Sequence, residues 1–323
     1  MYFKTNWFPV LLSAVIVLAI ADAVWDHYDA SGTSTTSAAD CWTGAGPNQI
    51  PVDANGAMIR YGRDLIANTS FYLGPKGTVM HISNGMNCQN CHLEAGTKPW
   101  GNNYGAVAST YPKFRERSGR KESIEKRVND CIERSLNGRA IDSSSKEMRA
   151  IAAYIKWLGK EVPMGSKPKG SGIMELTYLS RAADPANGKT VYVAYCERCH
   201  GKNGEGQINI DNAGYAYPPL WGNNSYNSGA GLFRLSRLAG YVKNNMPNPL
   251  NYHNPELTDE ESWDVAAYIN SQPRPTHDLS KDWPRIAGKP FDHPFGPYAD
   301  TFSEMQHKYG PFAEIVKAGK KSK

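Results

Sequence analysis

Residues 88–92 read Cys88-Gln-Asn-Cys-His92, and the same spacing returns at residues 196–200 as Cys196-Glu-Arg-Cys-His200. A C-x-x-C-H stretch is typical of covalent haem attachment, in which two thiols form thioethers with the porphyrin and the imidazole binds the iron. A redox C-x-x-C or half of a zinc site needs no histidine after the second cysteine, and neither predicts the repeat. The sequence therefore predicts two haem c groups. Their attachment cysteines and iron-ligating histidines are Cys88, Cys91, His92, Cys196, Cys199 and His200.

Length and charge limit the class of protein. The 323 residues are enough for two domains of about 100 to 150 residues and a tail. The chain has 36 Lys and Arg against 31 Asp and Glu, so its net charge is +5, with both signs mixed. Basic residues gather in an expected helix around residues 113–139 and at the C-terminus. This pattern predicts no nucleic-acid partner and favours small anions or an acidic redox partner.

The N-terminus carries an export signal. Residues 4–20 form an apolar segment, followed by small residues that suit a signal-peptide cleavage site, and we expect residues 1–25 to be cleaved. An uncleaved membrane anchor is the alternative, because residues 7–25 approach the roughly 17–25 residues that a membrane helix needs. In either case we expect a periplasmic protein. Residues 26–39 are polar and are expected to form a flexible tether.

The first globular unit is predicted at residues 40–160. A helical pattern over residues 58–66 precedes the first haem motif, after an intervening glycine-rich loop. Ser144 with Glu147 reads as a capping box that begins a second helix with an apolar stripe. Residues 161–180, which begin rich in Pro, Gly and Lys, are the expected linker to the next unit.

The second unit, residues 181–273, repeats this plan. A capping box at residues 258–261 begins its last helix, where Ala-Ala-Tyr-Ile at 266–269 matches Ala-Ala-Tyr-Ile at 152–155. The fold expected is therefore all-α, with two tandem cytochrome c domains. Residues 274–323 are rich in Pro, Gly and aromatic residues, and we expect this C-terminal tail to wrap around the two domains.

The expected sixth ligand of the second haem is Met246, which precedes a proline between the haem motif and the last helix. A thioether stabilises ferrous iron, so His/Met ligation raises the reduction potential and suits electron transfer. The alternatives are that Met246 fills space in the core and that His253 binds the iron instead.

The first unit has no comparable methionine but contains Cys131. Arg127, Cys131 and Ser135 are spaced i, i+4 and i+8, so they share one helix face. A thiolate on that face could bind ferric iron, and the guanidinium groups beside it suit an oxyanion. A Cys41–Cys131 disulfide, which export permits, and a buried inert thiol are the alternatives.

Seven motifs together point to a known family. They lie at residues 84–96, 127–138, 218–222, 229–231, 245–247, 296–300 and 306–311. With them the chain resembles the dihaem thiosulfate dehydrogenase and tetrathionate reductase family of cytochromes c, over most of residues 50–315. The resemblance implies that Cys131 is the distal thiolate ligand of the catalytic haem. It also implies that Arg117, Arg127 and Ser135 surround the substrate.

The activity that the resemblance implies is the coupling of two thiosulfates into tetrathionate with release of two electrons, or its reverse. Arg117 and Arg127 would hold sulfonate oxygens, Ser135 would add a hydrogen bond, and Cys131 would form a transient thiosulfonate adduct. Electrons would pass from the first haem to the second and then to a small cytochrome or other acceptor.

One position departs from some family members, which have a lysine before the methionine ligand as an alternative ligand in one redox state. Here that residue is Asn245, an amide, so we expect His/Met ligation in both states. Competing functions are an exported dihaem electron carrier without a substrate, a dihaem peroxidase, and another sulfur-compound oxidoreductase with a thiolate-ligated haem. The sequence leaves open the reaction direction and the role of Cys41.

Overall fold

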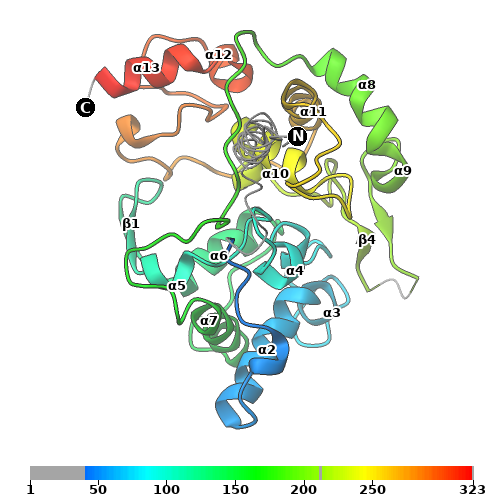
Figure 1. Ribbon diagram of the computed structural model, residues 1–323, viewed down its shortest axis with the longest axis vertical. Helices are drawn as coiled ribbons and strands as arrows, with labels where there is room; N and C mark the ends of the chain where they lie inside the picture. The colour runs from blue at the N-terminus through cyan, green and yellow to red at the C-terminus, as the bar shows by residue number, and fades with distance from the viewer. Residues whose placement is uncertain (1–40, 211–212, 322–323) are drawn as a thin grey trace, which may run out of the picture. The chain divides into compact units, whose positions relative to one another are not determined.

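The computed structural model describes residues 41–210 and 213–321 (Figure 1). The expected leader and tether, residues 1–39, lie outside these residues. Within the described part of the chain, none of the helices combines the length and apolar character needed to cross a bilayer. Contacts divide the chain after Asp40, and the fold below is that of the part that begins at Cys41.

Short helices dominate the structure, as the predicted all-α class requires. The first unit contains η2 Pro47–Gln49, α2 Ala54–Ala67, α3 Thr69–Leu73, η3 Cys88–Asn90, α4 Leu93–Gly96, α5 Val107–Thr110, β1 Lys113–Arg115, β2 Arg120–Glu122, α6 Ile124–Arg134 and α7 Lys146–Leu158. The second unit contains α8 Pro185–Tyr195, α9 Glu197–His200, β3 Gln207–Ile208, β4 Tyr215–Tyr217, η4 Gly231–Phe233, α10 Leu235–Asn245 and α11 Asp259–Ser271. The tail contains η5 Ile286–Gly288, α12 Glu304–Tyr309 and α13 Ala313–Lys321.

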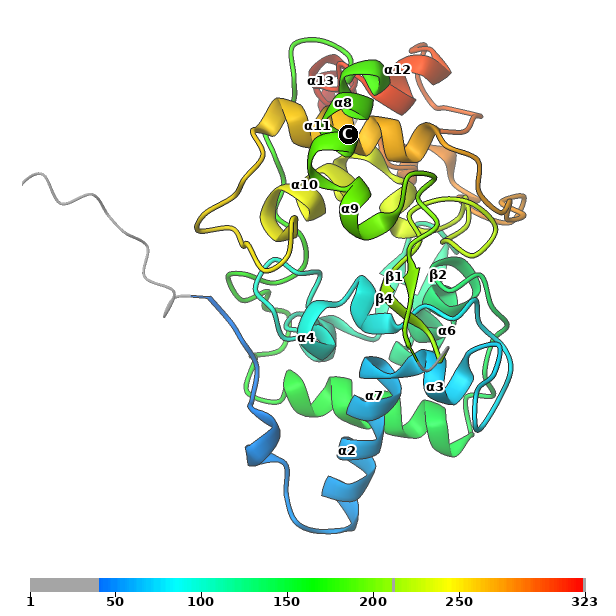
Figure 2. The ribbon, with the colours of Figure 1, turned by 90° about the vertical axis from the view of Figure 1, so that its right-hand side faces the viewer.

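The same helix crossing is built twice. In the first unit α2 packs against α7, and in the second α8 packs against α11 (Figures 1 and 2). A Cβ atom on Gly62 of α2 would lie 1.9 Å from the carbonyl oxygen of Ala150, and a Cβ on Gly188 of α8 would lie 1.9 Å from that of Asp264. Only glycine allows backbones to approach this closely, so each crossing depends on one glycine.

One capping box was predicted correctly and the other was placed one residue too early. Thr258 and Glu261 form the predicted reciprocal box at the start of α11. Helix α7, however, is capped by Ser145, whose hydroxyl accepts the Met148 N–H. The Ser144 hydroxyl and N–H instead both donate to the Asp142 carboxylate, which holds Ser144 in the preceding turn.

The predicted helix around residues 113–139 is wrong at both ends, because α6 spans only Ile124–Arg134. Strands β1 and β2 form an antiparallel hairpin before α6, with Lys113 opposite Glu122. Gly119 has a φ of +66° in the hairpin loop, and α6 begins only after Ser123, whose hydroxyl accepts the Lys126 N–H. Arg117 therefore lies in a hairpin loop rather than on a helix.

The tail contacts both units. Phe312 and Ile315 are buried in the core of the second unit. Earlier in the tail, the Trp283 backbone N–H donates to the carbonyl oxygen of Arg117 at 2.7 Å. These contacts bring the tail to the hairpin loop of the first unit.

Candidate functional site

The first haem motif presents an oriented imidazole. His92 Nδ1 lies 2.5 Å from the carbonyl oxygen of Asn102, and the His92 ring stacks on Tyr104 with ring centres 4.7 Å apart. A proton on Nδ1 bonds to that carbonyl, so Nε2 carries the lone pair that can bind a metal ion. This is the arrangement that metal-binding histidines usually have.

A cavity of about 560 Å³ adjoins this imidazole. Cys88, Cys91 and His92 line it together with Cys131 from α6. Apolar side chains complete the wall, namely Ile66, Tyr104, Leu136, Ile151 and Ile155. Two thiols for attachment, an imidazole and a further thiol, all set in an apolar wall, are the donor set and surroundings that a haem c group requires.

The thiols in this cavity differ in acidity. Burial raises the pKa of Cys88 to about 11 and that of Cys91 to about 12. Burial also raises the pKa of Cys131, but the Arg127 guanidinium and a hydrogen bond with His92 outweigh it and bring the pKa down to about 7. Cys131 is therefore the thiol of the three that ionises most readily, as a metal ligand or nucleophile must.

The disulfide alternative for Cys131 is wrong, because both Cys41 and Cys131 are free thiols. Cys41 instead neighbours the phenol of Tyr252, whose pKa is raised to about 12 by burial and by this thiol. Nothing in these contacts brings Cys41 to the cavity.

The predicted substrate residues lie around the same cavity, which Arg117, Arg127 and Ser135 line with Cys131. Arg127 and Cys131 are on α6, and Ser135 is the residue that caps its C-terminal end. Arg117 arrives from the hairpin loop, where Nη1 donates to the carbonyl oxygen of Gly229 at 2.7 Å. The negative charge of Cys131 raises the pKa of Arg127, against the effect of burial, so this guanidinium stays charged.

Several cavity residues carry no motif in the sequence. Within the described part of the chain, eight basic and three acidic side chains line the cavity. The basic ones are Lys113, Arg115, Arg117, Arg127, Arg134, Lys167, Arg234 and Arg237. Arg134 was noticeable as a neighbour of Cys131, whereas Arg234, Arg237 and Trp283 come from the second unit and the tail, where no local signal marks them. The excess of positive charge suits a small dianion.

The second haem motif is oriented in the same way as the first. His200 Nδ1 lies 2.8 Å from the carbonyl oxygen of Pro218, so Nε2 carries the lone pair that can bind a metal ion. Burial lowers the pKa of His200, so the ring is held in its neutral, metal-binding form. Met246 follows directly on α10 and packs half-buried against the second core. His253, the alternative ligand, is exposed, and its ring contacts that of Tyr252 with the two planes tilted by 35°.

Helix α10 links the second unit to the first haem motif. The Tyr241 hydroxyl donates to the carbonyl oxygen of Asn90, inside the first motif, at 2.7 Å. Asn245 is fully buried, and its Nδ2 donates to the carbonyl oxygens of Tyr241 and Trp100. The Asn245 amide, at the position where some family members have a lysine, thus joins the two units, and Met246 follows it immediately.

Comparisons with known proteins match both units of the chain. Residues 79–164 match the family model described as SoxA/TsdA, cytochrome c domain, and residues 185–273 match the cytochrome c family model. The thiosulfate dehydrogenase of Psychrobacter arcticus is 37% identical over 262 residues, which cover 79% of this chain and 75% of that protein. The thiosulfate dehydrogenase of Allochromatium vinosum is 37% identical over 230 residues, covering 70% of this chain and 82% of the relative.

A solved structure gives the same result. The as-isolated form of the thiosulfate dehydrogenase TsdBA from Marichromatium purpuratum matches with a TM-score of 0.68 at 31% identity, over 74% of this chain. The match spans 50% of that solved chain. The fold is therefore two tandem cytochrome c domains, and the protein carries two covalently bound haem c groups. With relatives this similar over most of their length, the chain belongs to the thiosulfate dehydrogenase family of dihaem oxidoreductases.

Proposed function

We propose that this protein oxidises thiosulfate, joining two thiosulfate anions into one tetrathionate with release of two electrons, and that it also catalyses the reverse reaction. The observation that carries the proposal is the position of the Cys131 thiol. It interacts with His92 and Arg127 in a cavity where eight Lys and Arg side chains outnumber three acidic ones among the described residues. A pure electron carrier has no need of an acidic thiol among guanidinium groups.

In the proposed reaction Cys131 acts as the sulfur partner. Its thiolate forms a disulfide bond with the terminal sulfur of one thiosulfate, which releases two electrons and leaves a Cys-S-S-sulfonate. The terminal sulfur of a second thiosulfate then attacks the sulfur that came from the first. Tetrathionate leaves and the Cys131 thiolate is restored, so charge and atoms balance over the two steps.

The cationic side chains hold the sulfonate groups. Arg117 and Arg127 present planar guanidinium groups, which bind sulfonate oxygens through paired hydrogen bonds, and Ser135 adds a hydroxyl donor. The two haem groups, when bound, accept the two electrons and deliver them to an external cytochrome or another acceptor. His92 and Cys131 are the proposed iron ligands in the first unit, and His200 and Met246 those in the second.

We further propose the domain limits expected from the sequence, with cytochrome c domains at residues 40–160 and 181–273 and the linker and tail at 161–180 and 274–323. We also propose export to the periplasm, where covalent haem attachment takes place in bacteria.

The test is stopped-flow visible spectroscopy of the purified holoprotein under anaerobic conditions. Thiosulfate should reduce the oxidised protein, and tetrathionate should reoxidise the reduced protein. Cys131→Ser should abolish both reactions. The matched variant Cys41→Ser, at the other cysteine outside the two haem motifs, should retain them. Full activity in Cys131→Ser would contradict the adduct step. Absence of any response in the unmodified protein, with only His/Met or His/His spectra, would instead indicate an electron carrier.

A further inference from the structure

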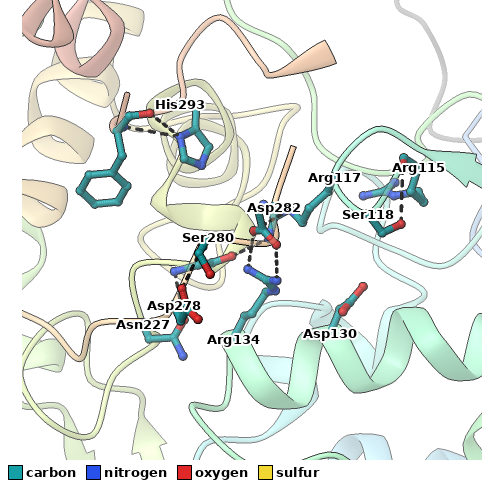
Figure 3. Close-up of polar contacts among 12 residues, drawn as sticks. Arg115, Arg117, Ser118, Asp130, Arg134, Asn227, Asp278, Ser280, Asp282 and His293 are labelled. Atoms are coloured by element: carbon teal, nitrogen blue, oxygen red, sulfur yellow. Dashed lines mark hydrogen bonds and ion pairs between the residues drawn. The ribbon is translucent and has the colours of Figure 1, made fainter. Parts of the chain in front are cut away.

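The buried Asp282 of the tail forms a paired ion contact with Arg134, which lines the cavity. Both Asp282 carboxylate oxygens accept from Arg134, with Nη1–Oδ2 and Nη2–Oδ1 distances of 2.8 Å each (Figure 3). The Asp282 side chain is 8% exposed and that of Arg134 12% exposed. A paired contact with so little solvent is strongly directional, so it sets the plane of the Arg134 guanidinium.

The same aspartate reaches a second cavity arginine. Arg117 Nε lies 3.9 Å from Asp282 Oδ2, and the Arg117 guanidinium lies over the indole of Trp283 at 5.3 Å from the ring centre. The Trp283 backbone N–H also donates to the Arg117 carbonyl oxygen at 2.7 Å. Two consecutive tail residues therefore hold both the backbone and the side chain of Arg117.

No local structure relates these two arginines. Arg134 is at the end of α6 and Arg117 is in the β1–β2 loop, whereas Asp282 contacts both (Figure 3). Burial and the nearby Arg134 lower the pKa of Arg117 to about 10, and Asp282 opposes that change. The carboxylate thus offsets the repulsion between two guanidinium groups that line one cavity.

The tail contains a second buried aspartate, Asp292, that binds an arginine of the cavity wall. Asp292 is fully buried, and its Oδ1 accepts from Arg234 Nε at 2.7 Å, while Oδ2 accepts from the Ser236 backbone N–H at 3.0 Å. Arg234 also lines the cavity, from the second unit. Asp282 and Asp292, which both bind arginines of the cavity wall, therefore come from the tail, a segment without a haem motif.

We propose that Asp282 is a positioning residue of the substrate site, which aligns Arg117 and Arg134 so that both guanidinium groups address one oxyanion. The proposal rests on the proposed function and deepens it in two ways. It adds Arg134 to the oxyanion-binding residues, and it makes the C-terminal tail part of the substrate site.

A purely structural role for Asp282 predicts a different result. If the contact only fastened the tail to the first unit, its loss would lower stability and leave the kinetics of the folded protein unchanged. If Asp282 aligns the arginines, its loss weakens the binding of thiosulfate more than it slows turnover. The ratio of KM to kcat effects therefore separates the two roles.

The experiment compares Asp282→Asn with Asp278→Asn in the holoprotein. Asp278 is an exposed aspartate of the same tail, whose carboxylate accepts from the Ser280 N–H. We expect Asp282→Asn to raise the KM for thiosulfate by about tenfold or more, since removing one partner of a desolvated charge pair has an effect of at least that order. Its kcat and haem content should change much less, and Asp278→Asn should match the unmodified protein. An unchanged KM in folded Asp282→Asn would overturn the proposal.

Two further measurements keep the test decisive. If Asp282→Asn does not fold, Asp282→Glu keeps the charge but displaces the paired contact. A raised KM in that variant supports the alignment and an unchanged KM overturns it. If the unmodified protein oxidises no thiosulfate, the proposed function fails, and calorimetric titration with thiosulfate then tests alignment alone. Weaker binding in Asp282→Asn than in Asp278→Asn supports the alignment, and equal binding overturns it.

Discussion

The two haem units share a scaffold and differ in the candidate second iron ligand that each one offers. Both cross two helices at a glycine, and both orient the haem-motif histidine through a backbone carbonyl. In the first unit the nearby side chain is the acidic thiol of Cys131, within a basic cavity. In the second unit the candidate ligand is Met246, packed against an apolar core. In the proposed mechanism one scaffold serves catalysis in the first unit and electron transfer in the second, and a few side chains outside the scaffold make the difference.

The most severe way to break this contrast is Cys131→Met, which would give the first unit the same ligand types as the second. We expect thiosulfate-dependent reduction to fall by about a thousandfold or more, because the nucleophile is lost. Stopped-flow spectroscopy measures it, with haem content as the control for folding. Activity within about tenfold of the unmodified protein would show that the thiolate is dispensable.

The converse change, Met246→Cys, would give the second unit a thiolate. We expect the potential of one haem to fall by a few tenths of a volt, within the span of about 0.8 V that axial ligands cover. A redox titration followed by visible spectroscopy measures both potentials. The control is His253→Ala at the exposed alternative position, which should leave them unchanged. The assignment of Met246 would be wrong if Met246→Cys left both potentials where they were.

The shared scaffold is tested by Gly62→Ala and Gly188→Ala. Each added Cβ would lie 1.9 Å from a carbonyl oxygen, so the helices must separate. We expect each variant to lose about 1–3 kcal/mol of unfolding free energy, as overpacked cores do. Thermal unfolding of the holoprotein measures the loss. Gly319→Ala, where a Cβ meets nothing within 4 Å, should cause none. A large effect at one crossing only would show that the two are not equivalent.

The smallest expected effect concerns the link between the units. Tyr241→Phe removes the hydrogen bond to the carbonyl oxygen of Asn90, and we expect a loss of about 1 kcal/mol in unfolding free energy. Chemical denaturation measures it against Tyr217→Phe, at a tyrosine that is 40% exposed. Equal stability of the two variants would mean that this bond does not hold the units together.

Local patterns in the sequence were enough to predict the haem motifs, the helices before and after the first of them, and the shared face of Arg127, Cys131 and Ser135. Each of these depends on residues within a few turns of one another. The β1–β2 hairpin was missed because its strands are three residues long and rich in charge, which mimics a basic helix.

The role of Asp282 could not be predicted for a different reason. Its partner Arg134 lies 148 positions away in the sequence, and an isolated aspartate in a loop-rich tail has no distinguishing pattern. Likewise, Arg234 and Arg237 reach the cavity only because the second unit packs beside the first. Contacts between distant segments depend on the packed fold, and no periodicity records them.

The packing of the first haem motif bears on modularity. Cys91 belongs to that motif and Leu93 follows it directly, yet both pack against the core of the second unit. A fragment that ended at the linker would expose these side chains to water and would also lack Asp282. Although the chain contains two copies of one fold, the first copy depends on the second unit to cover its haem motif and on the tail for the contact between Asp282 and Arg134.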